Sequence, residues 1–278
     1  MRHAGISCGG GSIHWNRPVH FIAYGAENDE IIADTHCHTI ASTHAYSTLN
    51  EMVHAAAVKG LYAIAITDHG VAMPDAPGKW YFQNLVVVPH KLEGVLVLRG
   101  EECDVIDYEG NTDLLESDLN SLDWIVASMH DPAMPKGPHS VEAITNAWLN
   151  ISKNPHIQVI GHSGSEQFKY DYERVIPEFG RNGKLVELNE ATFSNRRKSV
   201  QNCVQIMKLC KQYGVPIVVN TDSHFSARVG CFENSLRLLE ELDFPEELVV
   251  NSSVERFNAY LRQYTKVYQD PLLELDLL

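Results

Sequence analysis

Short apolar runs alternate with longer amphipathic segments from about residue 31 onward. Seven of the runs predict strands, at residues 30–35, 61–67, 94–100, 123–128, 157–161, 184–188 and 215–220. Several are apolar at nearly every position, which is typical of parallel strands covered on both faces. Helical patterns separate many of them, as in a chain of βα units. The pattern predicts an α/β fold, and a closed barrel fits it better than an open meander.

The helical segments carry recognisable end signals. Residues 47–60 begin with Ser47 or Thr48 as a candidate N-cap, and residues 195–214 place apolar side chains on one stripe and stop at Gly214. Cap residues of this kind predict where a helix starts and stops as well as its presence. Two further amphipathic helices are predicted, at residues 233–243 and 253–264.

The two ends of the chain lack such a pattern. Residues 1–30 contain "CGGGS" and no periodic apolar face, which predicts a flexible extension. Residues 31–278 are expected to form a single barrel domain, a length that suits this architecture. The last stretch, 267–278, is expected to pack on the barrel, and an exposed partner-binding tail is the alternative.

The composition is that of a globular protein without a membrane span. No apolar run approaches the roughly 18 residues that cross a bilayer, and residues 1–15 lack the continuous apolar region of a secretory signal. We therefore expect a cytoplasmic protein with no membrane partner. The six cysteines show no C-x-x-C pair, so reduced thiols are expected.

The formal net charge of -14 bears on the partner. A general nucleic-acid binder needs a basic stripe that displaces counterions from phosphates, so no nucleic-acid partner is expected. A small anionic substrate is compatible with this charge only if something strongly positive lies in the site. Bound metal cations would supply that charge.

Metal-capable side chains follow six of the seven predicted strands. In chain order they are His36, His38 and His44, then Asp68 and His69, then Glu101 and Glu102, then His130, then His162, and finally Asp222 and His224. The carboxyl ends of the parallel strands of a (β/α) barrel meet on one face, where such enzymes keep their active sites. We therefore expect these residues to form one spatial cluster.

Alternation along the strands sharpens this expectation. His36 and His38 are two residues apart and point to the same side, while Cys37 points to the other side. Asp222 and His224 repeat the two-residue spacing. Seven imidazoles and two carboxylates exceed what one tetrahedral or octahedral ion needs. Two or three metal ions are therefore predicted.

Each of these histidines also has a simpler interpretation. A single histidine near a strand end more often satisfies a local hydrogen bond than binds a metal ion. Seven of the fourteen histidines at strand exits are much harder to explain by accident. The other seven are left without a role: His3, His14, His20, His54, His90, His139 and His156.

The segments around these residues resemble the PHP (polymerase and histidinol phosphatase) superfamily, and within it the YcdX-like phosphatases. The matching segments are "DTHCHTIASTHAYST", "AITDHG", "DAPGKWYF", "LRGEEC", "ASMHDP", "IGHSG", "NTDSH" and "FENSLRLLEELDFPEELVVNSSVERFNAYL". They follow one another over roughly residues 31–262, and agreement at so many separate places is highly specific. One departure is "HSGS" where the family has "HPGN", which keeps His162 but places Ser163 and Ser165 beside it.

The resemblance implies a distorted (β/α)7 barrel with a three-metal centre. One ion would be held by His36, His38, Glu102 and Asp222. A second would share Glu102 as a bridge and take His130 and His162. A third would take His44, His69 and His224. Zinc is the first expectation for these divalent ions, with manganese or iron as alternatives, since imidazole and carboxylate ligands suit all three.

The implied activity is that of a metal-dependent phosphatase, a phosphoric monoester hydrolase acting on a small phosphorylated substrate. Close metal ions lower the pKa of a shared water toward roughly 7 and clamp the phosphoryl group, so a metal-bound hydroxide would be the nucleophile. Glu102 and Asp222 are the residues expected to matter most for catalysis.

Neighbouring residues have two interpretations each. Asp34 and Asp68 are candidates either to orient imidazole ligands or to cap a helix or turn. The cations that follow the strand at 184–188 either contact phosphate or begin a solvated helix without a substrate role, and they are Arg196, Arg197 and Lys198.

Two other functions stay open at this point. A phosphodiesterase or nuclease of the same superfamily would be favoured by a long basic groove, and the net charge counts against it. A PHP module without catalytic activity, serving as a scaffold, would be favoured by a missing ligand, and all nine ligand positions are filled. The oligomeric state is left open.

Overall fold

The computed structural model describes residues 31–74 and 76–269. The predicted extension at 1–30 and the predicted C-terminal segment from 270 onward lie outside the described residues. Each of the seven predicted runs overlaps one parallel strand, so the strand prediction is confirmed. The strands are β1 (Ala33–Cys37), β2 (Ala63–Ile66), β4 (Val95–Asp104), β5 (Trp124–Ser128), β6 (Val159–Ile160), β7 (Leu185–Asn189) and β8 (Ile217–Asn220).

These strands form a barrel that is nearly closed. Their order is β1-β2-β4-β5-β6-β7-β8, and neighbours pair in parallel. β1 and the segment after β8 meet through an isolated parallel bridge between Cys37 and Ser223. The predicted distorted (β/α)7 barrel is therefore confirmed. A short strand that the sequence did not predict, β3 (Lys91–Leu92), pairs antiparallel with β4, and two residues are too few to leave a periodic signal.

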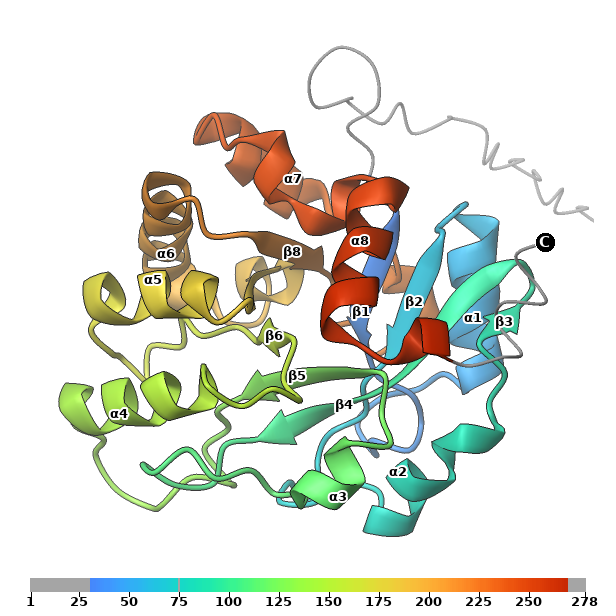
Figure 1. Ribbon diagram of the computed structural model, residues 1–278, viewed down its shortest axis with the longest axis horizontal. Helices are drawn as coiled ribbons and strands as arrows, with labels where there is room; N and C mark the ends of the chain where they lie inside the picture. Colours follow the sequence, from blue (N-terminus) through green and yellow to red (C-terminus); the bar gives the residue numbers. More distant parts are fainter. Residues whose placement is uncertain (1–30, 75, 270–278) are drawn as a thin grey trace, which may run out of the picture.

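Helices surround the strands and connect them (Figure 1). Within the described ranges the α-helices are α1 (Leu49–Val58), α2 (Lys79–Asn84), α3 (Glu116–Leu119), α4 (Val141–Ile151), α5 (Tyr172–Arg181), α6 (Val200–Tyr213), α7 (Glu233–Glu241) and α8 (Val254–Tyr264). Short 3₁₀ helices are η1 (Leu85–Val87), η2 (Glu190–Phe193), η3 (Arg197–Ser199), η4 (Ser226–Arg228), η5 (Glu246–Leu248), η6 (Val250–Ser252) and η7 (Val267–Gln269). The four predicted helices correspond to α1, α6, α7 and α8.

Local sequence determines where these helices begin and end. Thr48, rather than Ser47, caps α1: its hydroxyl accepts a hydrogen bond from the Glu51 N–H, and the Glu51 carboxylate accepts one from the Thr48 N–H. Gly214 follows α6 with a φ of 65°, a left-handed conformation that favours glycine. Ser253 caps α8 with its side chain.

Alternation along the strands divides the core into two layers. On β2, Ala63 and Ala65 belong to one apolar cluster, whereas Ile64 and Ile66 belong to another. The cluster with the alanines fills the barrel, because it joins β1 to Trp124 on β5, which is not a neighbour of β1. The cluster with the isoleucines packs against the surrounding helices.

The inner layer fills only the amino-terminal end of the barrel. α8 contributes Phe257, Tyr260 and Leu261 to this layer, and the Phe257 ring centroid lies 5.9 Å from that of Trp124. Large apolar side chains from one helix therefore close the barrel where the strands begin. The opposite end of the barrel is left to polar side chains.

The structure also bears on the thiols and on membranes. Cys37 and Cys103 lie in the outer layer, away from the barrel interior, as the alternation predicts. The five cysteines within the described ranges are free thiols, which agrees with the expectation of reduced cysteines.

Among residues 31–74 and 76–269, no helix combines the length and apolar character that crossing a membrane requires.

Candidate metal centre

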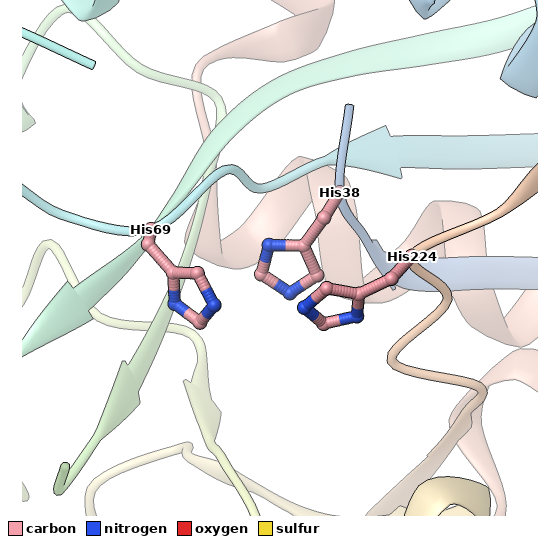
Figure 2. Close-up of side chains that lie close together, drawn as sticks. All are labelled: His38, His69 and His224. Carbon is pink, nitrogen blue, oxygen red and sulfur yellow. The ribbon is translucent and has the colours of Figure 1, made fainter. Parts of the chain in front are cut away.

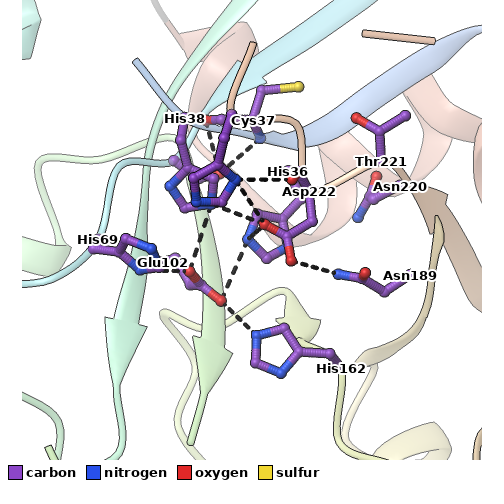
Figure 3. Close-up of polar contacts among 12 residues, drawn as sticks. His36, Cys37, His38, His69, Glu102, His162, Asn189, Asn220, Thr221 and Asp222 are labelled. Atoms are coloured by element: carbon purple, nitrogen blue, oxygen red, sulfur yellow. Dashed lines mark hydrogen bonds and ion pairs between the residues drawn. The ribbon is translucent and has the colours of Figure 1, made fainter. Parts of the chain in front are cut away.

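Glu102, near the end of β4, lies at the middle of a cluster of histidines (Figure 3). Its Oε1 atom is 2.8 Å from Nε2 of His162 and 3.3 Å from Nε2 of His36. Its Oε2 atom is 2.8 Å from Nδ1 of His69 and 3.6 Å from Nε2 of His38. Side chains from β1 and from the segments after β2 and β6 thus meet on one carboxylate, as the barrel geometry predicts.

Asp222 provides a second carboxylate beside the first. Its Oδ1 atom lies 3.2 Å from Nε2 of His38 and 3.8 Å from Nε2 of His36. One donor atom from each of these three residues falls within 4.8 Å of the others, a spacing that suits a shared ion. His130 joins on the other side, with its Nε2 atom 3.5 Å from Oε1 of Glu102. His69, Glu102 and His130 form a second close group.

A third close group consists of imidazoles alone. The rings of His38, His69 and His224 face one another from three separate segments (Figure 2), with donor nitrogens within 4.8 Å of one another. The ring of His44 lies beside them, with its centroid 5.0 Å from that of His69 and 4.4 Å from that of His224. All nine residues predicted as ligands therefore gather at one end of the barrel.

The donor set fits divalent cations. Many buried side-chain nitrogens and oxygens here have no hydrogen-bond partner: His36 Nε2, both ring nitrogens of His38 and of His69, Glu102 Oε2, Asp222 Oδ1 and His224 Nε2. His69 Nδ1 and Glu102 Oε2 are close together without the alignment of a hydrogen bond. Leaving so many buried polar atoms unpaired is costly, and cations coordinated between them would satisfy them together.

Backbone strain is concentrated at the same place. His162 has a φ of 22° and Asp222 a φ of 55°. The other non-glycine residues with positive φ in the described ranges are Glu93 and Asp243. Sparsely populated conformations of this kind cost roughly 1–3 kcal/mol and cluster at functional sites, where the surrounding structure holds them in place.

Two buried carboxylates that the sequence analysis did not select hold the rings in place. Glu187 on β7 accepts a hydrogen bond of 2.7 Å from Nδ1 of His36 and another from the N–H of His162. Asp104, at the end of β4, accepts one of 2.7 Å from Nδ1 of His130. Such contacts fix the tautomer and leave Nε2 free to bind a metal ion.

Both carboxylates left a signal in the sequence. Glu187 is an acidic residue among the apolar residues of "LVEL". Asp104 lies two residues after Glu102, so the alternation that pairs His36 with His38 also places it on the same side of its strand as Glu102.

The protonation states of the cluster suit metal binding. Burial raises the pKa of Glu102, but His36, His130 and His69 outweigh it and hold that pKa well below its usual range. Burial lowers the pKa of His130 to about 4, although Glu102 opposes the shift. Burial also lowers the pKa of His38. A carboxylate among neutral imidazoles is the form of these groups that coordinates cations.

His69 and His36 differ from these imidazoles. Burial would lower the pKa of His69, but Glu102 outweighs burial and raises it. His36 shows the stronger shift. Burial alone would lower its pKa, but Glu187, Glu102 and Asp222 outweigh burial and raise it well above its usual range. Three carboxylates therefore converge on one ring and favour a positive charge there. A divalent cation satisfies the same demand as a proton.

Asp34 and Asp68 hold loops rather than imidazoles. Asp34 accepts hydrogen bonds from the Thr221 hydroxyl, at 2.6 Å, and from the N–H groups of Thr221 and Gly230. Asp68 accepts hydrogen bonds from the Thr39 hydroxyl, at 2.8 Å, from the Thr39 N–H and from the Ser42 hydroxyl, all in the loop after β1. The hydrogen bonds of both carboxylates go to hydroxyl and backbone N–H groups, including the Tyr81 hydroxyl at 2.6 Å from Asp68, which favours the interpretation that they cap turns over the one that they orient rings.

The three cations after β7 occupy different positions. Arg196 donates to Asp222 Oδ2 at 2.7 Å and to Asn189 Oδ1 at 3.2 Å. Arg197 and Lys198 are exposed on η3, which leads into α6. Arg196 therefore lies at the centre, and contact of any of the three with phosphate stays a prediction.

The histidines within the described ranges that were left without a role lie elsewhere. His54 contacts Glu93, His90 contacts Asp123, His139 contacts Tyr108 and His156 contacts Glu116. Among the eleven histidines of the described ranges, the selection thus separated the seven clustered rings from the other four, and His3, His14 and His20 lie outside these ranges.

The cluster opens onto a cavity of about 550 Å³. Five of the nine predicted ligands line this cavity, and they are His44, His69, His130, Asp222 and His224. Arg196 and Arg228 line it as well. A small molecule in the cavity therefore contacts both the cluster and positively charged side chains.

Comparisons with known proteins give matches over most of the chain. The PHP domain family model matches residues 34–191. A protein from Caldicellulosiruptor saccharolyticus described as a probable phosphatase is 48% identical over 233 residues, which cover 84% of this chain and 97% of that relative. A probable phosphatase from Acetivibrio thermocellus is 45% identical over 234 residues, which cover 84% of this chain and 96% of the relative.

A solved structure shares the fold at much lower identity. It is a histidinol phosphate phosphatase from Lactococcus lactis complexed with zinc, L-histidinol and phosphate. The TM-score is 0.54 at 16% identity, and the match covers 77% of this chain and 95% of that chain. The two proteins therefore have the same kind of barrel.

Proposed function

We propose, from the premise that this chain belongs to the PHP domain family, that it is a metal-dependent phosphatase which hydrolyses small phosphate monoesters. One observation carries the proposal: nine histidine and carboxylate side chains from separate strand ends meet around Glu102, and many of their buried donor atoms have no partner. Structural hydrogen-bonding networks pair such atoms, whereas a metal centre leaves them facing its ions.

Three divalent ions are proposed, held as the family resemblance implies. The first would be held by His36, His38, Glu102 and Asp222, the second by Glu102, His130 and His162, and the third by His44, His69 and His224. The close group of His36, His38 and Asp222 falls within the first of these sets. The group of His38, His69 and His224 shares His69 and His224 with the third set and has His38 in place of His44. The remaining group joins His69 to Glu102 and His130, so His69 lies between the second and third sets.

Different residues of the chain would bind the ions, orient the ligands and add positive charge during hydrolysis. Divalent cations in such a cluster supply positive charge for the phosphoryl oxygens and make water a nucleophile at neutral pH. Glu102 would hold two ions at a short separation. Glu187 and Asp104 would keep the rings of His36 and His130 in the orientation that binds them. Arg196 would position Asp222 and add positive charge at the cavity wall.

The relatives support a phosphatase and a role for zinc. The curated relatives are described as probable phosphatases, and this chain matches them over nearly their whole length. The Lactococcus lactis protein of the same fold was solved with zinc, L-histidinol and phosphate. We extend this to monoester hydrolysis with zinc as the first candidate ion.

The test is hydrolysis by the metal-loaded protein, with metal content measured on the same sample. The screen contains 4-nitrophenyl phosphate, sugar phosphates, nucleotides and histidinol phosphate, with bis(4-nitrophenyl) phosphate as the diester. We expect phosphate release from monoesters and a loss of about 10³-fold in kcat for Glu102→Gln, since removing one electrostatic group of an active site costs roughly 10²–10³-fold and Glu102 contacts several ligands. Asp222→Asn is expected to behave similarly.

Glu116→Gln is the matched control, because Glu116 is an exposed carboxylate on α3 far from these contacts, with a side chain 86% exposed. It should leave kcat and metal content unchanged. Faster turnover of the diester than of any monoester would favour the phosphodiesterase instead. No hydrolysis of any ester with three metals bound would favour the scaffold.

A further inference from the structure

We propose that Arg228 binds a second anionic group of the substrate, so that the preferred phosphate monoesters also carry a carboxylate or a second phosphate. This inference rests on the proposed phosphatase function and names its substrate class. Its observations are the position of Arg228 in the cavity and the pairing of the other charges around it.

Arg228 and the metal-ligand candidates line one continuous cavity. Arg228 is the last residue of η4, the 3₁₀ helix that follows His224. The cavity of about 550 Å³ includes both of these residues in its wall. An ester whose phosphate lies at the cluster can therefore extend toward Arg228 without leaving the cavity.

Arg228 has no counter-charge of its own within the described part of the chain. Its side chain is exposed and forms no hydrogen bond or ion pair there. By contrast, the other arginine of the cavity, Arg196, is paired with Asp222 at 2.7 Å. A guanidinium in a cavity wall without a partner is suited to a carboxylate or phosphate, which it binds through two parallel N–H groups.

The remaining carboxylate of the cavity wall is already occupied. Glu190 accepts hydrogen bonds from the N–H and the side-chain amide of Asn234, at 3.1 and 2.6 Å. It accepts two more from the N–H and hydroxyl of Ser235, both at 2.7 Å. These donors at the start of α7 hold the Glu190 carboxylate, and within the described residues it forms no ion pair with Arg228.

Other side chains on the same wall favour an anion with an organic body. Lys59 donates to Sγ of Cys231 at 2.8 Å, and Cys231 lines the cavity, so a further positive charge lies behind this wall. Phe225 also lines the cavity and is 50% exposed, which offers an apolar surface to the carbon atoms between the two anionic groups.

The neighbouring cavity is a less suitable place for the second anion. Arg197 and Lys198 line it, but so do the carboxylates of Asp131 and Glu166. These opposite charges reduce the attraction for an anion. In the cavity at Arg228, both carboxylates of the wall are held by other groups, Asp222 by Arg196 and Glu190 by Asn234 and Ser235, and this pairing favours Arg228.

The experiment measures binding of phosphonates, which cannot be hydrolysed at the C–P bond by a phosphatase. Propylphosphonate carries one anionic group, 2-carboxyethylphosphonate adds a carboxylate, and propane-1,3-bisphosphonate adds a second phosphonate. Calorimetry on the zinc-loaded protein should show the two doubly anionic compounds binding about tenfold more tightly than propylphosphonate, which corresponds to about 1.4 kcal/mol. Arg228→Gln should abolish this preference, and the two doubly anionic compounds show which second anion is favoured.

Three comparison variants make the result specific. Arg237→Gln removes an exposed arginine from α7 outside the cavity wall and should keep the preference. Arg197→Gln and Lys198→Gln test the neighbouring cavity. Loss of the preference in either of these, or equal affinities of all three phosphonates for the unmodified protein, would overturn the inference while leaving the phosphatase proposal intact. Failure of every phosphonate to bind, together with no ester hydrolysis, would overturn both.

Discussion

The two ends of the barrel differ in whether their buried polar side chains form hydrogen bonds. Beside the start of β1, the side-chain amide of Asn251 donates to the carbonyls of Ala33 and Val219 at 2.7 Å each, and its oxygen accepts from the Val219 N–H at 3.0 Å. Where the strands end, His38 and His69 are buried, and neither ring nitrogen of either residue forms a hydrogen bond within the described part of the chain. Asn251 thus finds its hydrogen-bond partners within the folded chain. The buried nitrogens of His38 and His69 do not, and a bound metal ion would supply their partner.

This difference suggests that one end of the barrel contributes mainly to stability and the other mainly to metal binding. Apolar packing and paired polar groups at the amino-terminal end stabilise the barrel. That stability holds the strained backbone of His162 and Asp222 at the other end. Substitutions at the first end should therefore change unfolding, and substitutions at the second should change metal binding.

The largest effect on the closed end is expected from Phe257→Ala. Phe257 is fully buried and packs against Trp124, so its removal leaves a cavity between α8 and the strands. The free energy of unfolding should fall by about 3–5 kcal/mol, as is usual for a buried phenylalanine. Urea unfolding measures it. The folded fraction should still bind metal with unchanged affinity, and a loss of affinity would contradict the separation of the two ends.

A smaller effect, at the open end, is expected from Asp104→Asn. The substitution keeps the shape of the side chain but removes the charge that faces Nδ1 of His130. Metal affinity or activity should fall by about 10–100-fold, the usual cost of losing a carboxylate that orients a ligand. Competition with a chelator measures the affinity. An unfolding midpoint that falls while affinity stays constant would show that Asp104 is only structural.

The smallest effect is expected from Ser253→Ala at the closed end. It removes the hydroxyl that caps α8 and should lower the free energy of unfolding by about 1 kcal/mol. Ser253→Thr keeps a hydroxyl and should lose less. Thermal unfolding of the metal-free proteins compares the two, and a change in metal content in either variant would count against the proposed division.

The sequence by itself determined the strands and the main ligand candidates. Buried parallel strands are apolar on both faces, so the seven runs were visible without knowledge of their neighbours. Strand direction then placed His36, Glu102 and His224 at one end of the barrel, since all parallel strands of a barrel end on the same face. Thr48 and Gly214 similarly mark helix ends through local chemistry.

Only the tertiary structure decided which side chains face one another. The partnership of Glu187 with His36, across 151 positions of the chain, depends on how the barrel curves. Asp68 is bound by the Thr39 loop because that loop folds back on it. Within the described part of the chain Arg196 is paired and Arg228 is not, although both are arginines after a strand. The physical reason is that periodicity reports which face a residue occupies, whereas hydrogen bonds and ion pairs depend on distances of a few ångströms between segments that are remote in sequence.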